Sequence, residues 1–490
     1  MGEPERLSSI VIAGGGVTGW MAATALARFA PMMRVTVIDC PVDDVAVQAT
    51  LPAYKDFHAL IGVDEHEMLA RSGGTMRLGT RFADLARPGG YLHAFGDFGL
   101  EVGGVAFYQL WLRARAAGQP VDLDDYNLAA IAATMGRFAR PAADKRAMMD
   151  YGYHLDTALY AAFLRSLALA QGVGCEAGEI GSVTRDGESG RIAAILLRDG
   201  RSIEGDFFVD CTGAPAVLME ALDIGFEDWS GWFPSSREVA VDAGVLPDLP
   251  PLSSATAHLS GWERRLPLQH RTWHSFSFAP GETAEEAVPE ALGDRGEGDP
   301  RFTTHRRGRR QRFWAGNCVA LGAAAASIEP IEAGELDIAS DGIAALLSLF
   351  PDRGDADAEG DEFDRIMSAS IEAQRDLTLL HHVVILEGKA VLQMSGEARA
   401  LPDSLAHRIK LFRGRGRLRP RDAGGFGPAD WLAVLIGRGA IPASWAPLAD
   451  TIDIPRAQQN FLRLAGLFRQ SAETMPGHAA YIARHCAYRP

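Results

Sequence analysis

The pattern of apolar and polar residues divides the chain into a strand-rich first part and a helix-rich last part. Its first forty residues predict a strand that ends in a glycine turn at 7–16, a helix over 19–30 whose apolar residues recur at helical spacing, and a second strand at 33–39. A strand, a helix and a strand in this order form one βαβ unit, which indicates an α/β protein.

The middle of the chain is less regular. Residues 85–150 are rich in aromatic residues and arginine and predict a mixed insertion, after which an amphipathic helix begins near residue 156. Alternating residues and Asp-Gly and Ser-Gly turns over 180–210 predict antiparallel strands that return to a core strand. Beyond residue 365 helical patterning dominates, so a helical part covers the sheets below it.

Three strongly charged stretches interrupt this pattern. The acidic, glycine- and proline-bearing stretches at 280–300 and 351–364 predict solvated loops. Six arginines crowd into 301–313, and we interpret them as solvated residues on an edge strand rather than as a patch for nucleic acid.

Composition and charge narrow the class of protein. The formal net charge of −15 disfavours nucleic acid and anionic membranes as partners, because both would repel the chain. No stretch has the pattern of a signal peptide or a membrane span. The five cysteines lack metal-ligand spacing, so we expect no metal site and a reducing, cytoplasmic location.

A glycine motif at the first strand-to-helix junction predicts a nucleotide site. Gly14, Gly16 and Gly19 form GxGxxG, and Asp39 lies 20 residues beyond Gly19. Such glycines allow a tight turn, a close approach of the backbone to a pyrophosphate and close helix packing, while the helix N-terminus attracts phosphate and the acid binds a ribose. Either FAD or NAD satisfies this motif.

Two later stretches favour FAD. FFVDCTG at 207–213 is a buried strand that runs into Asp210 and Gly213, and FWAGNCVALGAAAASIEPIE at 313–332 is a strand with a glycine turn. In two-part flavoproteins such strands bring distant segments to the same sheet. Because only one GxGxxG stands at a strand-to-helix junction, we expect a separate reductase to supply reduced flavin.

Nearly the whole chain resembles the flavin-dependent tryptophan halogenases. The resemblance rests on IVIAGGGVTGWMAA, YHLDTALYAAFL, FFVDCTG, NCVALGAAAASIEPIE, PDSLAHRIKLFRGRGRL and DWLAVLIGRGAIPASWAPLAD. It implies a Rossmann-like FAD-binding box with an antiparallel substrate-side sheet, capped by a mainly helical C-terminal pyramid. It also implies that reduced FAD and oxygen generate hypohalous acid, which reaches a lysine and a glutamate beside an aromatic, indole-like substrate.

Several chemical positions depart from the family's pattern. GGTMRLGTRF places Arg77 where the family has its reactive lysine, whereas Glu332 keeps the place of the glutamate. The Ser-Thr-Gly that normally helps to hold the halide becomes Ala333, Gly334 and Glu335. If the Glu335 carboxylate lay about 5 Å from a halide, repulsion of about 3 kcal/mol at an effective dielectric of about 20 would weaken halide binding about a hundredfold.

The tunnel and flavin-contacting motifs also change. In the Trp-x-Trp-x-Ile-Pro motif, Trp262 and Pro267 are kept, but Arg264 replaces the second tryptophan and Leu266 the isoleucine. The flavin loop, residues 47–52, has Val47 and Gln48 in place of Gly and Glu. We also expect Trp111 to line an aromatic pocket with Trp262 and Pro267. The expected cofactor contacts are Gly14, Gly16, Val17, Thr18, Gly19, Asp39, Ala49, Thr50, Asp210, Gly213, Gly322 and Gly334.

These observations lead to one functional hypothesis with two alternatives. We expect residues 1–365 to form the FAD-binding box, with insertions at about 85–150 and 225–300, and residues 366–490 to form the helical part. The chain is then an FAD-dependent oxidoreductase that oxygenates or halogenates a small aromatic substrate, using Arg77 and Glu332. The alternatives are a true halogenase, favouring bromide, in which Arg77 replaces lysine, and an FAD-binding protein without turnover. A homodimer is compatible with all three.

Overall fold

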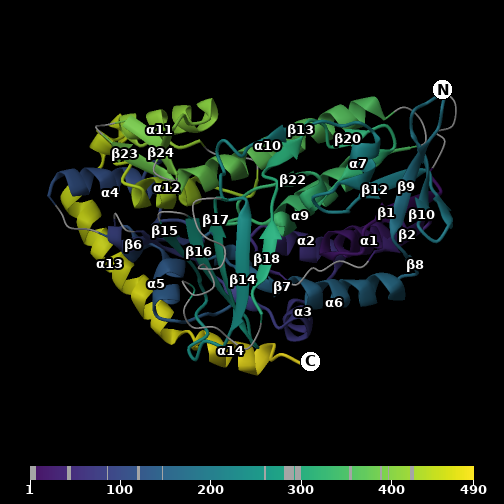
Figure 1. The fold of residues 1–490 in the computed structure, drawn as a ribbon. Helices are drawn as coiled ribbons and strands as arrows, with labels where there is room; N and C mark the ends of the chain where they lie inside the picture. The colour runs from purple at the N-terminus through teal and green to yellow at the C-terminus, as the bar shows by residue number, and fades with distance from the viewer. Residues whose placement is uncertain are drawn as a thin grey trace.

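The computed structural model describes residues 7–490, apart from 41–45, 85–86, 119–121, 146, 259–260, 281–291, 293–298, 353–355, 387–388, 395–396 and 420–423. Most of the acidic stretch at 280–300 therefore lies outside the described residues. In the described part, a parallel sheet with its helices occupies one side of the molecule and a long, mostly antiparallel sheet occupies its middle (Figure 1).

The parallel sheet is built around the first strand. Its order is β20 (Trp314–Ala315), β21 (Cys318–Ala320), β12 (Phe207–Asp210), β1 (Ser9–Ala13), β2 (Arg34–Asp39) and β8 (Gly174–Ala177). All neighbours pair in parallel except β20 and β21. Because β1 is apolar and central, all five of its residues are buried. Helix α1 (Val17–Phe29) packs against α6 (Thr157–Ala170) and α9 (Glu335–Ser348). The predicted Rossmann-like fold is confirmed.

The predicted hairpins between residues 180 and 210 are also present. Strands β9 (Ile180–Arg185), β10 (Ile192–Leu197) and β11 (Ser202–Glu204) form an antiparallel sheet, and the chain then enters the buried strand β12. The Asp-Gly and Ser-Gly dipeptides supply the turns that this arrangement needs.

A seven-stranded, mostly antiparallel sheet matches the antiparallel sheet predicted from the sequence. Its order is β18 (Arg301–Thr304), β14 (Arg237–Ala243), β17 (Thr272–Phe278), β16 (Gly261–Pro267), β15 (Ser253–His258), β5 (Gly79–Asp84) and β6 (Arg87–Ala94). Only β15 and β5 pair in parallel. Strands from the first hundred residues and from 237–304 thus share one sheet, which brings Arg77, just before β5, close to the tunnel motif on β16.

Two small sheets support the site. One joins β3 (Val47–Ala49), β7 (Gly152–Asp156) and β4 (Thr75–Arg77), and the other joins β13 (Phe226–Asp228), β19 (Gly308–Arg310) and β22 (Ala326–Ser327). Our interpretation of the arginines at 301–313 is wrong in part, because β19 is the central strand of its sheet. Arg307 and Arg310 are only 2% and 1% exposed. Each bonds to backbone carbonyls, and Arg310 also pairs with Glu220.

Helices complete the molecule. They are α2 (Tyr54–Ile61), α3 (Glu65–Ser72), α4 (Phe107–Ala116), α5 (Leu128–Thr134), α7 (Val217–Ala221), α10 (Asp357–Leu380), α11 (Asp403–Arg415), α12 (Pro428–Gly437), α13 (Ile454–Thr474) and α14 (His478–His485). The last two run along one edge of the molecule to the C-terminus (Figure 1). None of the helices in the described ranges is both long and apolar enough to cross a membrane.

Helix α10 differs from the sequence prediction. It begins at Asp357, within the stretch that we expected to be a loop, and it runs through the boundary placed after residue 365. Asp357 and Glu359 lie in its first turn, where acidic side chains stabilise a helix. The mainly helical last part also contains an antiparallel sheet of β23 (Val383–Leu386), β24 (Lys389–Met394) and β25 (Glu397–Arg399).

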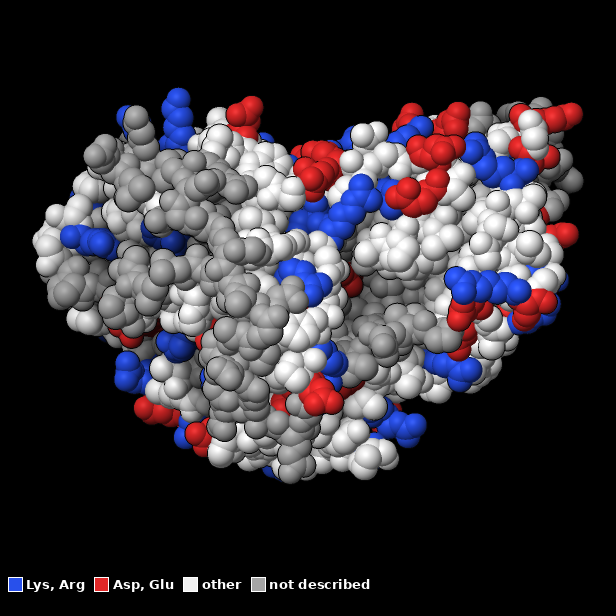
Figure 2. Space-filling model, in the orientation of Figure 1, with Lys and Arg blue, Asp and Glu red and all other residues white. Residues whose placement is uncertain are grey.

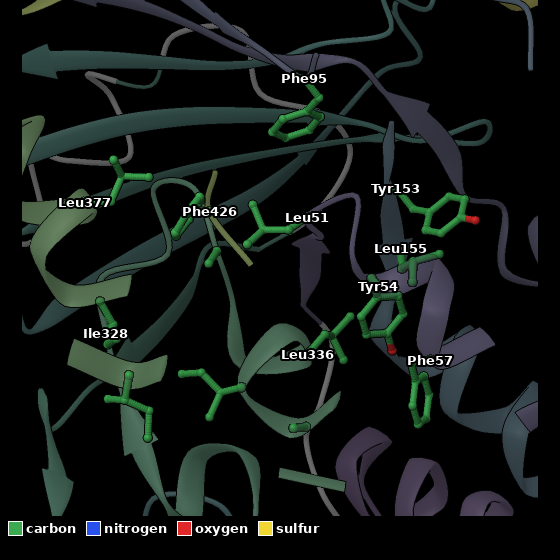
Figure 3. Close-up of a cluster of buried hydrophobic side chains, with 14 of the residues drawn as sticks. Leu51, Tyr54, Phe57, Phe95, Tyr153, Leu155, Ile328, Leu336, Leu377 and Phe426 are labelled. Carbon is green, nitrogen blue, oxygen red and sulfur yellow. The ribbon is translucent and has the colours of Figure 1, made fainter. Parts of the chain in front are cut away.

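The main hydrophobic core joins segments that are distant in sequence. Leu51 from the flavin loop, Leu336 from α9 and Phe426 from the segment before α12 lie in one cluster (Figure 3). A Cβ on Gly425 would lie 3.2 Å from Leu51 Cδ1, so the C-terminal part packs directly on the flavin loop. On the face drawn in Figure 2, acidic and basic side chains are interspersed and the surface is hollowed near its middle.

The close packing at the start of α1 gives a testable prediction. A Cβ on Gly19 would lie 1.9 Å from the carbonyl oxygen of Gly14, and a backbone atom has little room to move. Gly19→Ala should therefore lower the free energy of unfolding by about 1–3 kcal/mol, which is the usual cost of overpacking. Urea denaturation measures this cost.

The matched control is Gly466→Ala in α13, where a Cβ meets no atom within 4 Å. Because this helical position is exposed and alanine forms helix better than glycine, Gly466→Ala should raise the free energy of unfolding by up to about 1 kcal/mol. Equal midpoints for the two variants would contradict the packing argument.

Candidate functional site

The glycine turn after β1 has the geometry of a dinucleotide site. Gly14 has φ +110°, a value that favours glycine, and its N–H bonds to the carbonyl of Ile38 on β2. Gly16 is the N-cap of α1, which has no side-chain cap and no acidic residue in its first turn. The N-terminal N–H groups of α1 therefore face no carboxylate of their own helix, which fits the binding of a pyrophosphate. Val17 is the first residue of the helix.

Asp39 and Gly322 border the same turn. A Cβ on Gly15 would lie 1.9 Å from Asp39 Oδ1, so the carboxylate at the end of β2 adjoins the turn. Gly322 has φ +58°, and a Cβ there would lie 2.6 Å from the hydroxyl of Thr18 on α1. The turn after β21 thus closes against the start of α1, as a site built from three strand ends requires.

The carboxylate of Asp210 has four hydrogen-bond donors from its own part of the chain. Its Oδ1 accepts hydrogen bonds from the N–H and hydroxyl of Thr212, and its Oδ2 accepts from the N–H groups of Leu218 and Met219. Burial raises the pKa of Asp210, and these hydrogen bonds partly offset that effect. The carboxylate caps α7, and its contact with the cofactor stays a prediction. Gly213 has φ +73°, and a Cβ there would lie 4.0 Å from Pro215 Cδ.

The flavin loop is tied to the N-terminus of α9. Gln48 Oε1 accepts the N–H of Leu336 at 3.1 Å. Asp337 accepts the N–H of Leu51 through Oδ1 and that of Gly334 through Oδ2, at 2.9 and 3.1 Å. Burial, with a smaller contribution from Asp341, raises the pKa of Asp337 to about 7. Two amides at the start of α9 therefore already have acceptors from this chain.

Arg77 and Glu332 form an ion pair at the centre of the site. Arg77 Nη2 lies 2.8 Å from Glu332 Oε2, and both side chains are 0% exposed. Arg77 Nε donates to the Ser253 hydroxyl at 3.0 Å, Nη1 donates to the carbonyl of Thr50 at 2.9 Å, and Nη2 also donates to the hydroxyl of Thr80. Burial lowers the pKa of Arg77 and Glu332 raises it, and the guanidinium stays charged because its ordinary pKa lies far above neutrality.

Sequence reasoning missed two residues that join this pair. His93 Nδ1 lies 2.6 Å from Glu332 Oε1, and His93 Nε2 lies 2.9 Å from Asp430 Oδ1. Phe95, two residues after His93, places its ring 4.9 Å from the guanidinium carbon of Arg77. A lone histidine in YLHAFG carries no signal that would have revealed these contacts, because its partners are 239 and 337 residues away.

The tunnel motif, residues 262–267 on β16, lies beside the cluster that Arg77 and Glu332 form with His93. Trp262 packs in a small core with Phe82 and Ile331, next to Glu332, and Thr75 donates to the carbonyl of Pro267 at 2.7 Å. Trp111 is buried on α4 with the guanidinium of Arg115 over its ring. The described contacts of Trp111 do not bring it to the Arg77–Glu332 pair.

Arg264 stands where the family motif has its second tryptophan, so a charged side chain replaces an aromatic one. Its guanidinium donates to the carbonyl of Pro330 at 2.6 Å and pairs with Glu238 at 3.0 Å. Burial would raise the pKa of Glu238, but Arg264 and His305 hold it well below its usual range. The charge of Arg264 is thus balanced by the carboxylate of Glu238.

Glu335 lies in the first turn of α9 and interacts electrostatically with the buried Arg307. Burial lowers the pKa of Arg307, and three carboxylates, Glu335 among them, raise it. A cation therefore accompanies the carboxylate that we expected to repel a halide, which reduces that repulsion.

Comparisons with known proteins agree over nearly the whole chain. The family model for tryptophan halogenase matches residues 9–454. The chain is 33% identical to a flavin-dependent halogenase from Xanthomonas campestris, with a TM-score of 0.93 and 99% of each chain covered. It is 32% identical to BrvH, a flavin-dependent halogenase from Brevundimonas, with a TM-score of 0.90 and coverage of 98% and 99%.

A curated relative gives the same result. The chain is 26% identical to the tryptophan 6-halogenase SttH of Streptomyces toxytricini, and 97% of each protein is covered. Flavin-dependent halogenases use FAD that a separate flavin reductase reduces, so the cofactor predicted from the sequence is confirmed at the level of the family. The chain belongs to the tryptophan halogenase family of flavin-dependent enzymes.

Proposed function

We propose that this protein uses reduced FAD and oxygen to oxidise a small, indole-like aromatic substrate, and that the oxidant acts beside Arg77 and Glu332. Membership of the family supports the cofactor, and the names of the curated relatives point to an indole-bearing substrate. The observation that carries the proposal is the fully buried ion pair at the position where the resemblance expects a reactive amine.

The residues around the glycine turn fit FAD. The uncapped start of α1 would hold the pyrophosphate, and Asp39 would accept hydrogen bonds from the ribose. The flavin loop and the start of α9 would border the ring system. When bound, FAD supplies the electrons that reduce oxygen to an electrophilic oxidant.

Arg77 differs chemically from a lysine. Its guanidinium stays protonated, and its delocalised nitrogen atoms are weak nucleophiles. All three of its nitrogen atoms already donate hydrogen bonds to neighbouring groups. Arg77 therefore forms no covalent adduct with a halogen. It keeps Glu332 ionised and fixed in orientation.

The N-terminus of α9 favours oxygen transfer over the use of a halide. A helix N-terminus attracts an anion because its N–H groups lack partners. Here Asp337 and the Gln48 side chain accept the N–H groups of Gly334 and Leu336. A halide at this position would compete with two oxygen atoms of the chain itself.

Bromination is the second candidate. The relatives are halogenases, and Arg77 Nη1, which donates one N–H to Thr50, has a second N–H that can donate to hypobromous acid. Bromide is the more favourable halide because it is oxidised more easily than chloride.

The first test combines the protein with FAD, a flavin reductase, oxygen, bromide and a panel of indoles. Mass spectrometry should detect products that carry one added oxygen, whose yield does not depend on bromide. A product with the isotope pair of bromine would instead support the second candidate. Oxygen consumption without any altered indole would contradict both and would indicate an FAD-binding protein without turnover.

The second test restores the amine. Arg77→Lys should raise the rate of bromination about tenfold, which corresponds to about 1.4 kcal/mol in the barrier, because a lysine nitrogen is compact and nucleophilic once deprotonated. Liquid chromatography with mass spectrometry measures the initial rate, and flavin fluorescence confirms that FAD still binds.

Arg81→Lys is the matched control for this change. Arg81 lies four residues away on β5 and is exposed, so its replacement should leave the products unchanged. An Arg77→Lys variant that binds FAD and shows no gain in bromination would contradict the role assigned to the missing amine.

A further inference from the structure

His93 is a charged bridge between two carboxylates. Its two ring nitrogens lie 2.6 Å from Glu332 Oε1 and 2.9 Å from Asp430 Oδ1. An ionised carboxylate only accepts hydrogen bonds, so both nitrogens must carry protons when both acids are ionised. Burial alone would lower the pKa of His93, but the charge of Glu332 and the hydrogen bond to Asp430 raise it to about 10.

The four charges of this chain of contacts balance. Arg77 and His93 are cations, and Glu332 and Asp430 are anions. This balance allows Glu332 to stay ionised although it is fully buried. Without the charge of Asp430, one of the two cations beside Glu332 would have no counter-ion.

Asp430 is itself held in place. Its Oδ2 accepts the N–H of Gly427 at 2.6 Å, as the third residue of a helix does when it caps α12. Its side chain is 17% exposed, whereas His93 and Glu332 are 0% exposed. The C-terminal part of the chain therefore contributes the Asp430 carboxylate to this cluster, at the boundary with solvent.

Other groups lie along this chain of contacts and do not replace the bridge. Thr80 donates its hydroxyl to Glu332 at 3.1 Å. His381 Nε2 lies 3.5 Å from Oε1, but burial and the charge of His93 lower the pKa of His381 well below its usual value, so it is neutral. Asp337 acts electrostatically on Arg77 from α9. Asp97, whose pKa burial and Asp430 both raise, adds a second acid beyond Asp430.

We propose that Asp430, through His93, is a positioning residue that keeps Glu332 ionised and oriented during the oxidation. This inference rests on the proposed function. When an electrophile adds to an aromatic ring, the ring C–H bond must break, its electron pair restores aromaticity, and the proton passes to a base. The cationic ring is a strong acid, so a carboxylate such as that of Glu332 can accept this proton.

The test removes the charge of Asp430 and keeps its shape. In the wild-type protein, nitrogen NMR of labelled histidine should show His93 doubly protonated throughout about pH 6 to 9, since its pKa lies above this range. In Asp430→Asn, the pKa of His93 should fall into this range, and the pH profile of kcat should gain an inflection there. The signal is assigned by its loss in His93→Gln.

Two further variants separate the charge from the fold. Asp97→Asn removes a neighbouring acid that does not bond to His93, and it should leave both the titration and the pH profile unchanged. Asp430→Glu keeps the negative charge and should restore the high pKa of His93 if Asp430→Asn is poorly folded.

The outcomes distinguish this inference from the proposed function. An unshifted His93 titration in Asp430→Asn would overturn the bridge, whatever the activity. A shifted titration in a protein that makes no oxidised product would support the charge coupling and overturn the proposed function, and with it the positioning role in oxidation.

Discussion

The buried ion pair between Arg77 and Glu332 is the interaction on which the site depends. Neither side chain reaches solvent, so each charge depends on an opposite charge beside it. Removing one partner of such a pair typically costs about 3–5 kcal/mol, because the remaining charge stays buried without compensation. The pair fixes the segment before α9 against β4. It also places one positive and one negative charge where an oxidant would act.

The same pair joins parts of the chain that fold as separate elements. Thr50 contributes a carbonyl from the flavin loop, Thr80 a hydroxyl from the seven-stranded sheet, and Asp430 a carboxylate, through His93, from α12. A change in the flavin loop therefore reaches Arg77 directly. Because Gln48 and Asp337 also tie this loop to α9, the loop, the start of α9 and the Arg77–Glu332 pair form one hydrogen-bonded unit.

The sequence predicts the features whose residues lie close together along the chain. The glycine turn and Asp39 follow one another within a single βαβ unit, and alternating residues and turn dipeptides show the hairpins before β12. The identities of Arg77 and Glu332 came from the resemblance, but their pairing could not be predicted because 255 residues separate them. His93 and Asp430 escaped for the same reason. The helix cap made by Asp210 was not predicted either, because a carboxylate after a buried strand can either meet a cofactor or cap the next helix.

A crystal structure of the FAD-bound protein tests the central claim most directly. Our account expects yellow crystals in which FAD lies on the glycine turn and the Arg77 guanidinium remains within hydrogen-bonding distance of the Glu332 carboxylate. A structure in which Arg77 has left Glu332 and extends toward the flavin or solvent would contradict it.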